Sequence, residues 1–185
     1  SAQLTTQKKY GVGPSYLYDV LRVDLKTGGT LLLSTGYGAR VMRLNNNYDT
    51  VWVKLFTDFA ISDAIMNSDN EIIIAGQRIY PTATNFGGYG IEILKIDLNG
   101  NLISSRYREA GIGDLTIPKM YPSIVEYKAN NYILSFTDFF QSQSTYNSIL
   151  LKLDHDFNVV DSKIAPFAGN LIYLLPRHLV AKKSN

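Results

Sequence analysis

The sequence predicts an all-β fold built from a repeated four-stranded antiparallel unit. A basic residue inside a short apolar strand recurs three times, at Arg43, Lys95 and Lys152, and each copy continues into a polar turn and another apolar stretch. The apolar runs are short and bounded by Asn, Asp and Gly, a pattern of strands and turns, and helical periodicity is almost absent. The basic residues lie 52 and then 57 positions apart, a spacing that indicates a repeat architecture.

Each unit is expected to contain four strands, the third of which carries the repeated basic residue. In the first unit we expect Tyr18–Asp24, Thr30–Thr35, Arg40–Leu44 and Val51–Phe56. In the second we expect Ile61–Met66, Glu71–Ala75, Ile91–Asp97 and Leu102–Tyr107. In the third we expect Ser123–Tyr127, Tyr132–Thr137, Ser148–Asp154 and Val159–Ile164, and Leu171–Leu175 would begin a fourth. Spacing alone makes Tyr18–Asp24 a first strand, because Leu21–Leu25 also matches the third-strand motif.

Four antiparallel strands repeated at this period are typical of β-propeller blades. Blades stack face to face, so a middle strand is buried on both sides and reads as a continuous apolar run, such as Ile72–Ile74. The stretch Leu94–Ile103 resembles the repeat of secreted bacterial β-propeller proteins, in which a strand ending Lys-Ile/Leu-Asp precedes an Asn-Gly-Asn hairpin. The copy at Asn45–Asp49 lacks the leading Asp, and the copy at Asp154–Asn158 lacks the Gly. The resemblance implies a fold and an extracellular, cell-surface or periplasmic location, and it leaves the function open.

The predicted organisation is a polar N-terminal arm over residues 1–15, a propeller-like repeat domain over 16–175 and a basic C-terminal tail over 176–185. Three blades and one further strand are too few to close a ring, since propellers typically have four to eight blades. An open end would expose a long apolar strand edge, which proteins normally cover. We therefore expect a protein partner or additional blades to complete the ring.

Composition excludes several classes of protein. The 185 residues carry a net charge of only +2 with scattered basic residues, which argues against nucleic-acid binding. Cysteine is absent, so disulfides and thiolate metal sites are excluded, and no apolar run approaches the 18 residues of a membrane-spanning helix. We expect no cofactor and no metal. Asp97, Asn99 and Asn101 match the opening of a calcium loop, but the downstream Glu is missing and a hairpin is the favoured interpretation.

The predicted topology places all tight hairpins at one rim of the blades and all long loops at the other. The long loops are expected at Gln77–Gly88, Arg108–Met120 and Asp138–Thr145. Long loops on a rigid scaffold commonly carry binding function, so this rim is the predicted site. The candidate binding residues there are Asp58, Phe59, Arg78, Tyr80, Tyr107, Arg108, Asp138, Phe139 and Phe140.

These candidates have simpler structural interpretations as well. The near-duplicates Phe56–Phe59 and Phe136–Phe140 each contain an Asp, which would cap a turn while the neighbouring Phe packs between blades. Arg and Tyr together are common interface anchors. Arg108 beside Glu109 is equally consistent with a surface ion pair of little energetic weight.

The sequence favours a non-catalytic, secreted or cell-surface module that binds a protein or a glycan on the long-loop rim. One alternative is a structural subunit of a larger bacterial envelope assembly. Another is a polysaccharide-active enzyme in which Asp58 and Asp138 flank one glycosidic bond, which requires a separation within about 10 Å. No catalytic residues are predicted, because neither His155 nor His178 has the partners of a catalytic triad.

Overall fold

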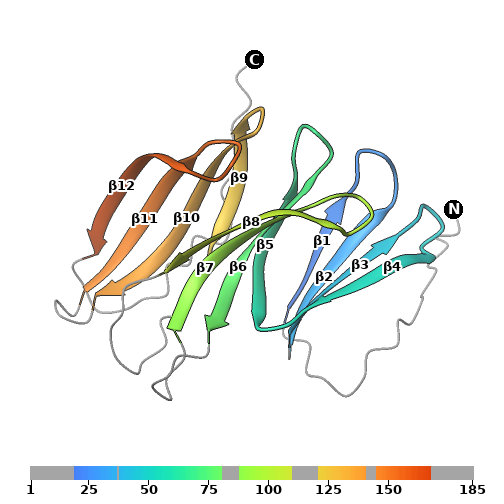
Figure 1. Ribbon diagram of the computed structural model, residues 1–185, viewed down its shortest axis with the longest axis horizontal. Helices are drawn as coiled ribbons and strands as arrows, with labels where there is room; N and C mark the ends of the chain where they lie inside the picture. The colour runs from blue at the N-terminus through green and yellow to red at the C-terminus, as the bar shows by residue number, and fades with distance from the viewer. Residues whose placement is uncertain (1–18, 37, 81–87, 110–120, 141–144, 168–185) are drawn as a thin grey trace, which may run out of the picture.

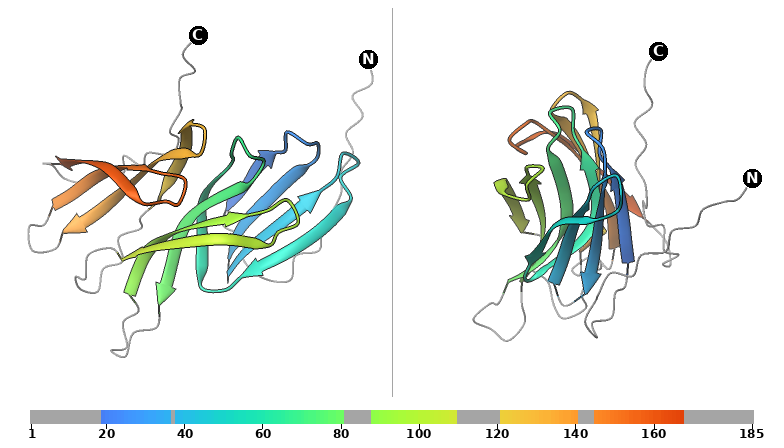
Figure 2. Two further views of the ribbon diagram at one scale, coloured as in Figure 1. Left: turned by 45° about the horizontal axis from the view of Figure 1, so that its top comes forward. Right: turned by 90° about the vertical axis from the view of Figure 1, so that its right-hand side faces the viewer.

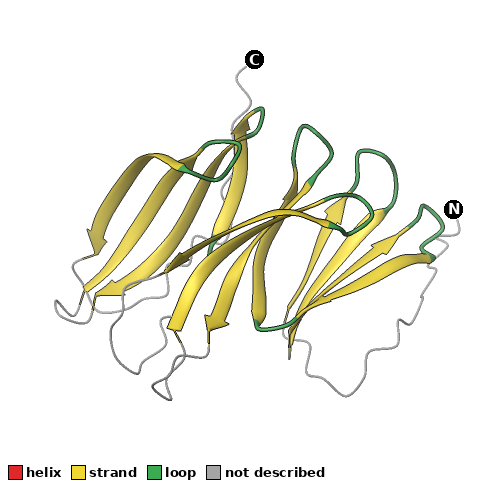
Figure 3. Cartoon of the chain, viewed as in Figure 1, coloured by secondary structure: helices red, strands yellow, loops and turns green. Residues whose placement is uncertain are grey.

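The computed structural model describes residues 19–36, 38–80, 88–109, 121–140 and 145–167. These residues form twelve β-strands and no helix (Figures 1 and 3). The strands make three four-stranded antiparallel sheets, each formed by four consecutive strands in sequence order. The predicted all-β fold with repeated four-stranded units is therefore confirmed, and among the described strands the ring is not closed.

We call the three sheets blades 1, 2 and 3. Blade 1 contains β1 (Asp19–Asp24), β2 (Thr30–Gly36), β3 (Gly38–Leu44) and β4 (Thr50–Phe56). Blade 2 contains β5 (Phe59–Met66), β6 (Ile72–Tyr80), β7 (Gly88–Ile96) and β8 (Leu102–Glu109). Blade 3 contains β9 (Ser123–Lys128), β10 (Asn131–Phe140), β11 (Thr145–Leu153) and β12 (Val159–Phe167). The strand that was ambiguous in the sequence is β1, a first strand as its spacing predicted. The predicted arm at 1–15, the strand Leu171–Leu175 and the tail at 176–185 lie outside the described residues.

Five hairpins share one five-residue geometry. In each, the first residue donates its backbone N–H to the carbonyl of the fifth, and the fourth donates back to the carbonyl of the first. The fourth residue has a positive φ, from 61° at Tyr48 to 77° at Gly100 and 91° at Gly28. The hairpins span residues 25–29, 45–49, 67–71, 97–101 and 154–158. Four of them begin with Asn or Asp, which pull the chain into the turn by accepting backbone amides.

The strand topology separates two rims. The five five-residue hairpins lie along the upper edge in Figure 1, whereas β2, β6 and β10 end at the lower edge, here called the loop rim. The strands run further toward the loop rim than expected. Pairing continues to Tyr80 with Gly88 and to Phe140 with Thr145, so parts of the predicted loops are strand. Neighbouring backbones satisfy one another's hydrogen bonds there, which local sequence did not reveal. The remainder of the predicted loops lies outside the described residues.

The blades pack face to face around two apolar layers (Figure 2). Ile72 and Ile74 of β6 enter the layer shared with blade 1, whereas Ile73 and Ala75 enter the layer shared with blade 3. All four are fully buried, so β6 must be apolar at successive positions rather than at alternate ones. The innermost strands β1, β5 and β9 are neighbours, as in a propeller.

The repeated basic residue joins each blade to the next. The Arg43 guanidinium donates to the carbonyl oxygen of Leu98 at 2.8 Å, and the Lys95 ammonium donates to that of His155 at 3.2 Å. Leu98 and His155 are both the second residue of the outer hairpin of the following blade. The motif that repeats in the sequence is therefore an inter-blade hydrogen bond that repeats in space.

Candidate functional site at the loop rim

Three predicted binding residues lie together on the face of blade 2 that is turned toward blade 1. Phe59 of β5 pairs with Arg78 of β6, and Tyr107 of β8 pairs with Glu92 of β7. Strand alternation places Arg78 on the face of Ile72 and Ile74, which pack against blade 1. Phe59 begins β5, Arg78 and Tyr107 lie two residues before the ends of β6 and β8, and Glu92 lies in the middle of β7.

Two glycines make room for the aromatic rings in this group. A Cβ at Gly76 would collide with the Phe59 ring and with the backbone carbonyl of Ala60. A Cβ at Gly90 would collide with the Tyr107 ring. The rings therefore lie flat against bare backbone, a packing that covers a glycine in a strand and fixes the ring orientation.

An ion pair between Arg78 and Glu92 occupies the centre of the group. Glu92 is 5% exposed, and a carboxylate this deeply buried requires a charged partner. The Arg78 side chain keeps 23% of its surface accessible, and its guanidinium carbon lies 5.7 Å from the Phe59 ring centroid. Its Nη1 also approaches the carbonyl of Thr57 at 3.5 Å. Because Arg78 is held from several sides, its charge is preorganised at the rim.

The other predicted residues are distributed around this group. Asp58 lies in the turn between β4 and β5, is exposed and has a positive φ of 56°. Arg108 is exposed and points to the face of β8 opposite Tyr107, since adjacent strand residues alternate. Tyr80 ends β6.

The two Phe-Thr-Asp-Phe segments differ in structure although their sequences are near-duplicates. Asp58 and Phe59 turn from one blade into the next, and Phe59 is buried between blades 1 and 2. Asp138 instead lies inside β10, where it pairs with Asn147, and Phe139 and Phe140 complete that strand. The side chains of Tyr80, Asp138, Phe139 and Phe140 lie outside the described part of the structure.

Sequence reasoning missed Glu92, which holds Arg78. The available signal was a single carboxylate inside the apolar run Ile91–Ile96, because a buried charge in such a run implies a partner. It also began the third strand of the second unit at Ile91, although Gly90 already lies inside β7.

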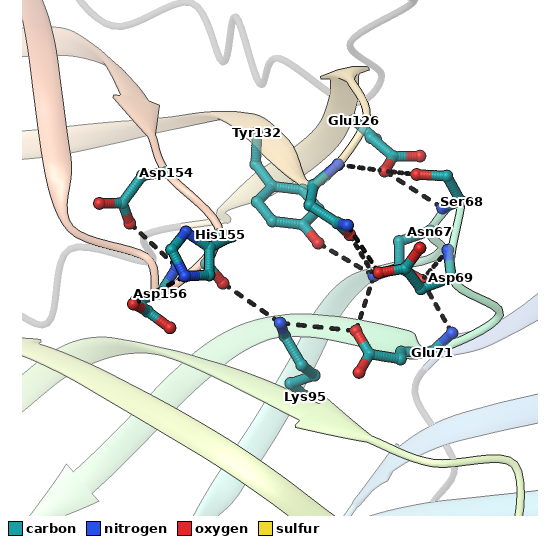
Figure 4. Close-up of polar contacts among 11 residues, drawn as sticks. Asn67, Ser68, Asp69, Glu71, Lys95, Glu126, Tyr132, Asp154, His155 and Asp156 are labelled. Atoms are coloured by element: carbon teal, nitrogen blue, oxygen red, sulfur yellow. Dashed lines mark hydrogen bonds and ion pairs between the residues drawn. The ribbon is translucent and has the colours of Figure 1, made fainter.

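The hairpin rim carries a second polar group, between blades 2 and 3, which is also absent from the sequence predictions (Figure 4). Asn67 is fully buried, and its Oδ1 accepts the backbone amides of Asp69 and Glu71 at 3.1 and 2.8 Å. Its Nδ2 donates to Tyr132 Oη and to Asn130 Oδ1, both at 3.1 Å. Every polar atom of the Asn67 side chain is therefore used to hold the turn and the two blades together.

The surroundings of Asn67 extend this connection. Glu126 of blade 3 accepts from the backbone amide of Ser68 at 3.1 Å, and the Lys95 ammonium lies 3.4 Å from the Glu71 carboxylate. Lys95 also lies 5.3 Å from the Phe157 ring centroid. Burial raises the pKa of the Tyr132 hydroxyl, which the bond from Asn67 partly offsets. At the hairpin rim, these contacts hold blades 2 and 3 together.

The hairpin interpretation of the calcium-like sequence is confirmed. Asp97 Oδ1 accepts the backbone amides of Asn99 and Asn101, both at 2.8 Å. The bond from the Asn101 amide is the main reason that the pKa of Asp97 is lowered, and the Asn158 amide lowers the pKa of Asp154 in the same way. Within the described ranges, no cluster of three or more His, Asp or Glu residues is arranged to hold a metal ion.

Comparison with known proteins leaves the family unassigned. No protein-family model matches the sequence, and no curated protein matches it. A solved protein of unknown function from Bacteroides caccae has a similar structure, with a TM-score of 0.46 and 13% identity over 81% of this chain. The chain spans 61% of the length of that protein. Among the described residues, no helix is long and apolar enough to cross a membrane.

Proposed function

We propose that the chain is a non-catalytic binding module, secreted or on the cell surface, that presents its loop rim to a protein or glycan. The observation that carries the proposal is the Arg78–Glu92 pair set beside Phe59 and Tyr107 at that rim. Glu92 fixes the guanidinium, and the rings add apolar surface of fixed orientation. Arg and Tyr of this kind commonly anchor ligands, since they combine planar hydrogen bonding with a large contact area.

The contrast between the rims supports the same location. On the hairpin rim, Asn67, Tyr132 and Lys95 are engaged in contacts between blades. On the loop rim, Tyr107 is only half-buried and Arg108 is exposed, so both can contact a ligand without separating the blades. The proposed extracellular or envelope location rests on the hairpin resemblance to secreted bacterial propellers.

Binding by two classes of ligand can be measured with the same variants. A panel of polysaccharides tests glycan binding, and capture from extracellular and envelope fractions tests protein binding. For any retained ligand, Tyr107→Ala combined with Arg108→Ala should raise the Kd at least about 30-fold, the loss expected for interface anchors. Arg106→Ala, an exposed change in the same strand further from the rim, is the matched control.

The fold of each variant is checked by circular dichroism and thermal melting, because Tyr107 covers Gly90. A double variant that folds and binds as tightly as the wild type would refute the rim assignment. Equal losses in the double variant and in Arg106→Ala would also contradict it. Turnover of a polysaccharide by the wild type would instead support the alternative enzyme hypothesis.

A further inference from the structure

One cross-strand row of side chains is repeated in all three blades. It reads Val23, Leu31 and Arg43 in blade 1, Ile65, Ile73 and Lys95 in blade 2, and Val125, Ile133 and Lys152 in blade 3. In blades 1 and 2 the next blade covers this row, and Leu31 and Ile73 are fully buried. In blade 3, no described strand packs over it, and Val125 and Ile133 are only half-buried.

Lys152 is therefore an inter-blade donor at the end of the series. It occupies the register position of Arg43 and Lys95, which each donate to a carbonyl of the following blade. Its ammonium lies 5.8 Å from the Tyr127 ring centroid, and no carbonyl among the described residues accepts a hydrogen bond from it. The outward face of blade 3 thus carries the apolar pair and the cation of an inter-blade contact.

The complementary half lies at the opposite end of the molecule. Asn46 is the second residue of the outer hairpin of blade 1, the position of the acceptors Leu98 and His155 in blades 2 and 3. Asn46 is exposed, and no described cation donates to its carbonyl. The chain therefore holds both halves of the contact that it makes twice internally.

The outer face of blade 1 is more polar than the equivalent faces of the other blades. Its polar residues are Arg22, Ser34 and Arg40, on the first, second and third strands. The equivalent positions, in the same order, are Ala64, Gly76 and Glu92 in blade 2, and Ile124, Phe136 and Ile149 in blade 3. Leu32 and Met42 keep the centre of that face apolar and are half-buried. A polar rim around an apolar centre is typical of an interface between separately folded chains rather than of an interior.

We propose that two copies of this chain close a six-bladed ring, with blade 3 of each copy packed on blade 1 of the other. Lys152 of each copy donates to the Asn46 carbonyl of its partner. Three blades from each copy give a number within the four to eight that close a propeller. A twofold axis makes the two contacts identical, so the ring closes without leaving a face open. This inference goes beyond ligand binding at the loop rim and does not depend on it.

The mass of the full chain in solution is the first test. Light scattering should give a dimer of the 20.7 kDa chain. Lys152→Met should raise the dimer dissociation constant about tenfold or more, because the partner's hairpin carbonyl loses its charged donor. Arg106→Met is the matched control, since Arg106 is an exposed cation of a middle blade and should leave the dimer unchanged. A monomer, or an open series of larger species, would overturn the ring.

Cross-linking locates the contact, because the natural chain has no cysteine. Chains carrying Lys152→Cys are mixed with chains carrying Asn46→Cys and treated with a short bis-maleimide. A covalent dimer should form only in the mixture. Lys95→Cys combined with His155→Cys in one chain is the positive control for the same geometry. A dimer in solution without this cross-link would overturn the proposed interface. A monomer in which position 152 instead cross-links to a cysteine introduced within residues 168–185 would show that the chain covers its own face.

Discussion

Asn67 is the first residue of a five-residue hairpin, as Asp97 and Asp154 are in theirs. Of these three side chains, only that of Asn67 also donates hydrogen bonds. All three side chains accept two backbone amides of their own turn. The Nδ2 of Asn67 additionally donates to two side chains of blade 3 and to Glu71. The substitution Asn67→Asp keeps the turn acceptor and removes this donor. The turn should therefore survive while the connection between blades 2 and 3 is weakened.

The expected loss in the free energy of unfolding is about 2–4 kcal/mol at pH 7. The two N–H groups of Nδ2, shared among three acceptors, contribute about 2 kcal/mol net, and a buried carboxylate beside Glu71 adds repulsion. The hydroxyl of Tyr132 can rotate and donate to the introduced carboxylate, which returns about 1 kcal/mol. The reverse exchange Asp97→Asn, in an exposed hairpin, should cost clearly less than Asn67→Asp.

Urea unfolding of both variants and the wild type, at pH 7 and pH 4.5, measures these differences. Burial and the neighbouring carboxylate raise the pKa of the introduced group in the folded state above the unfolded value of about 3.9. The penalty of Asn67→Asp is therefore full above the folded pKa and shrinks as the pH falls toward 3.9. A loss no larger than that of Asp97→Asn, or one independent of pH, would refute the assigned role of Nδ2.

Three further outcomes follow from the same contacts. Lys95→Met should lower the unfolding free energy in urea by about 2 kcal/mol and Arg43→Met by about 1, because a Trp indole also donates to the carbonyl that Arg43 reaches; equal losses would contradict this. Asp97 and Asp154 have lowered pKa values, so they stabilise the fold above the unfolded value of about 3.9, and that stabilisation is lost as the pH falls through the folded values. The melting temperature measured from pH 5 to pH 2 should therefore fall less steeply with pH when Asp97→Asn and Asp154→Asn are combined than in the wild type. An unchanged slope would contradict the stabilising role of the two carboxylates. Gly76→Ala should destabilise by about 2 kcal/mol or more, because its methyl group would meet a backbone carbonyl and a buried ring; a melting temperature equal to that of the wild type would show that the strand can adapt.

The strand content was predictable because it is encoded locally. Each hairpin places its Asn, Asp or Gly between two apolar runs, and antiparallel neighbours in sequence pair with one another. Even the ambiguous segment ending at Asp24 was resolved by its distance from the next turn. The strand ends near Tyr80 and Phe140 were not predictable, because their pairing depends on backbone groups across a loop.

The candidate site was predicted in part. Phe59, Arg78 and Tyr107 were chosen for their residue type and their rim, and the structure places them on one face. Arg108 was grouped with Tyr107 because they are adjacent in sequence, but alternation along β8 separates them. The binding role of all these residues stays a prediction.

The sequence by itself determined that the chain forms β-blades, where the turns lie and which cation repeats. Hairpin formation and binary patterning depend on neighbouring residues, so one chain read from end to end contains that information. Only the tertiary structure decided what the repeated cation does, since Arg43 and Lys95 find their carbonyls 55 and 60 residues away. It also decided that Glu92 holds Arg78 and that Asn67 joins two blades. Those contacts cross a layer between sheets, and their distances and burial exist only once the blades are packed.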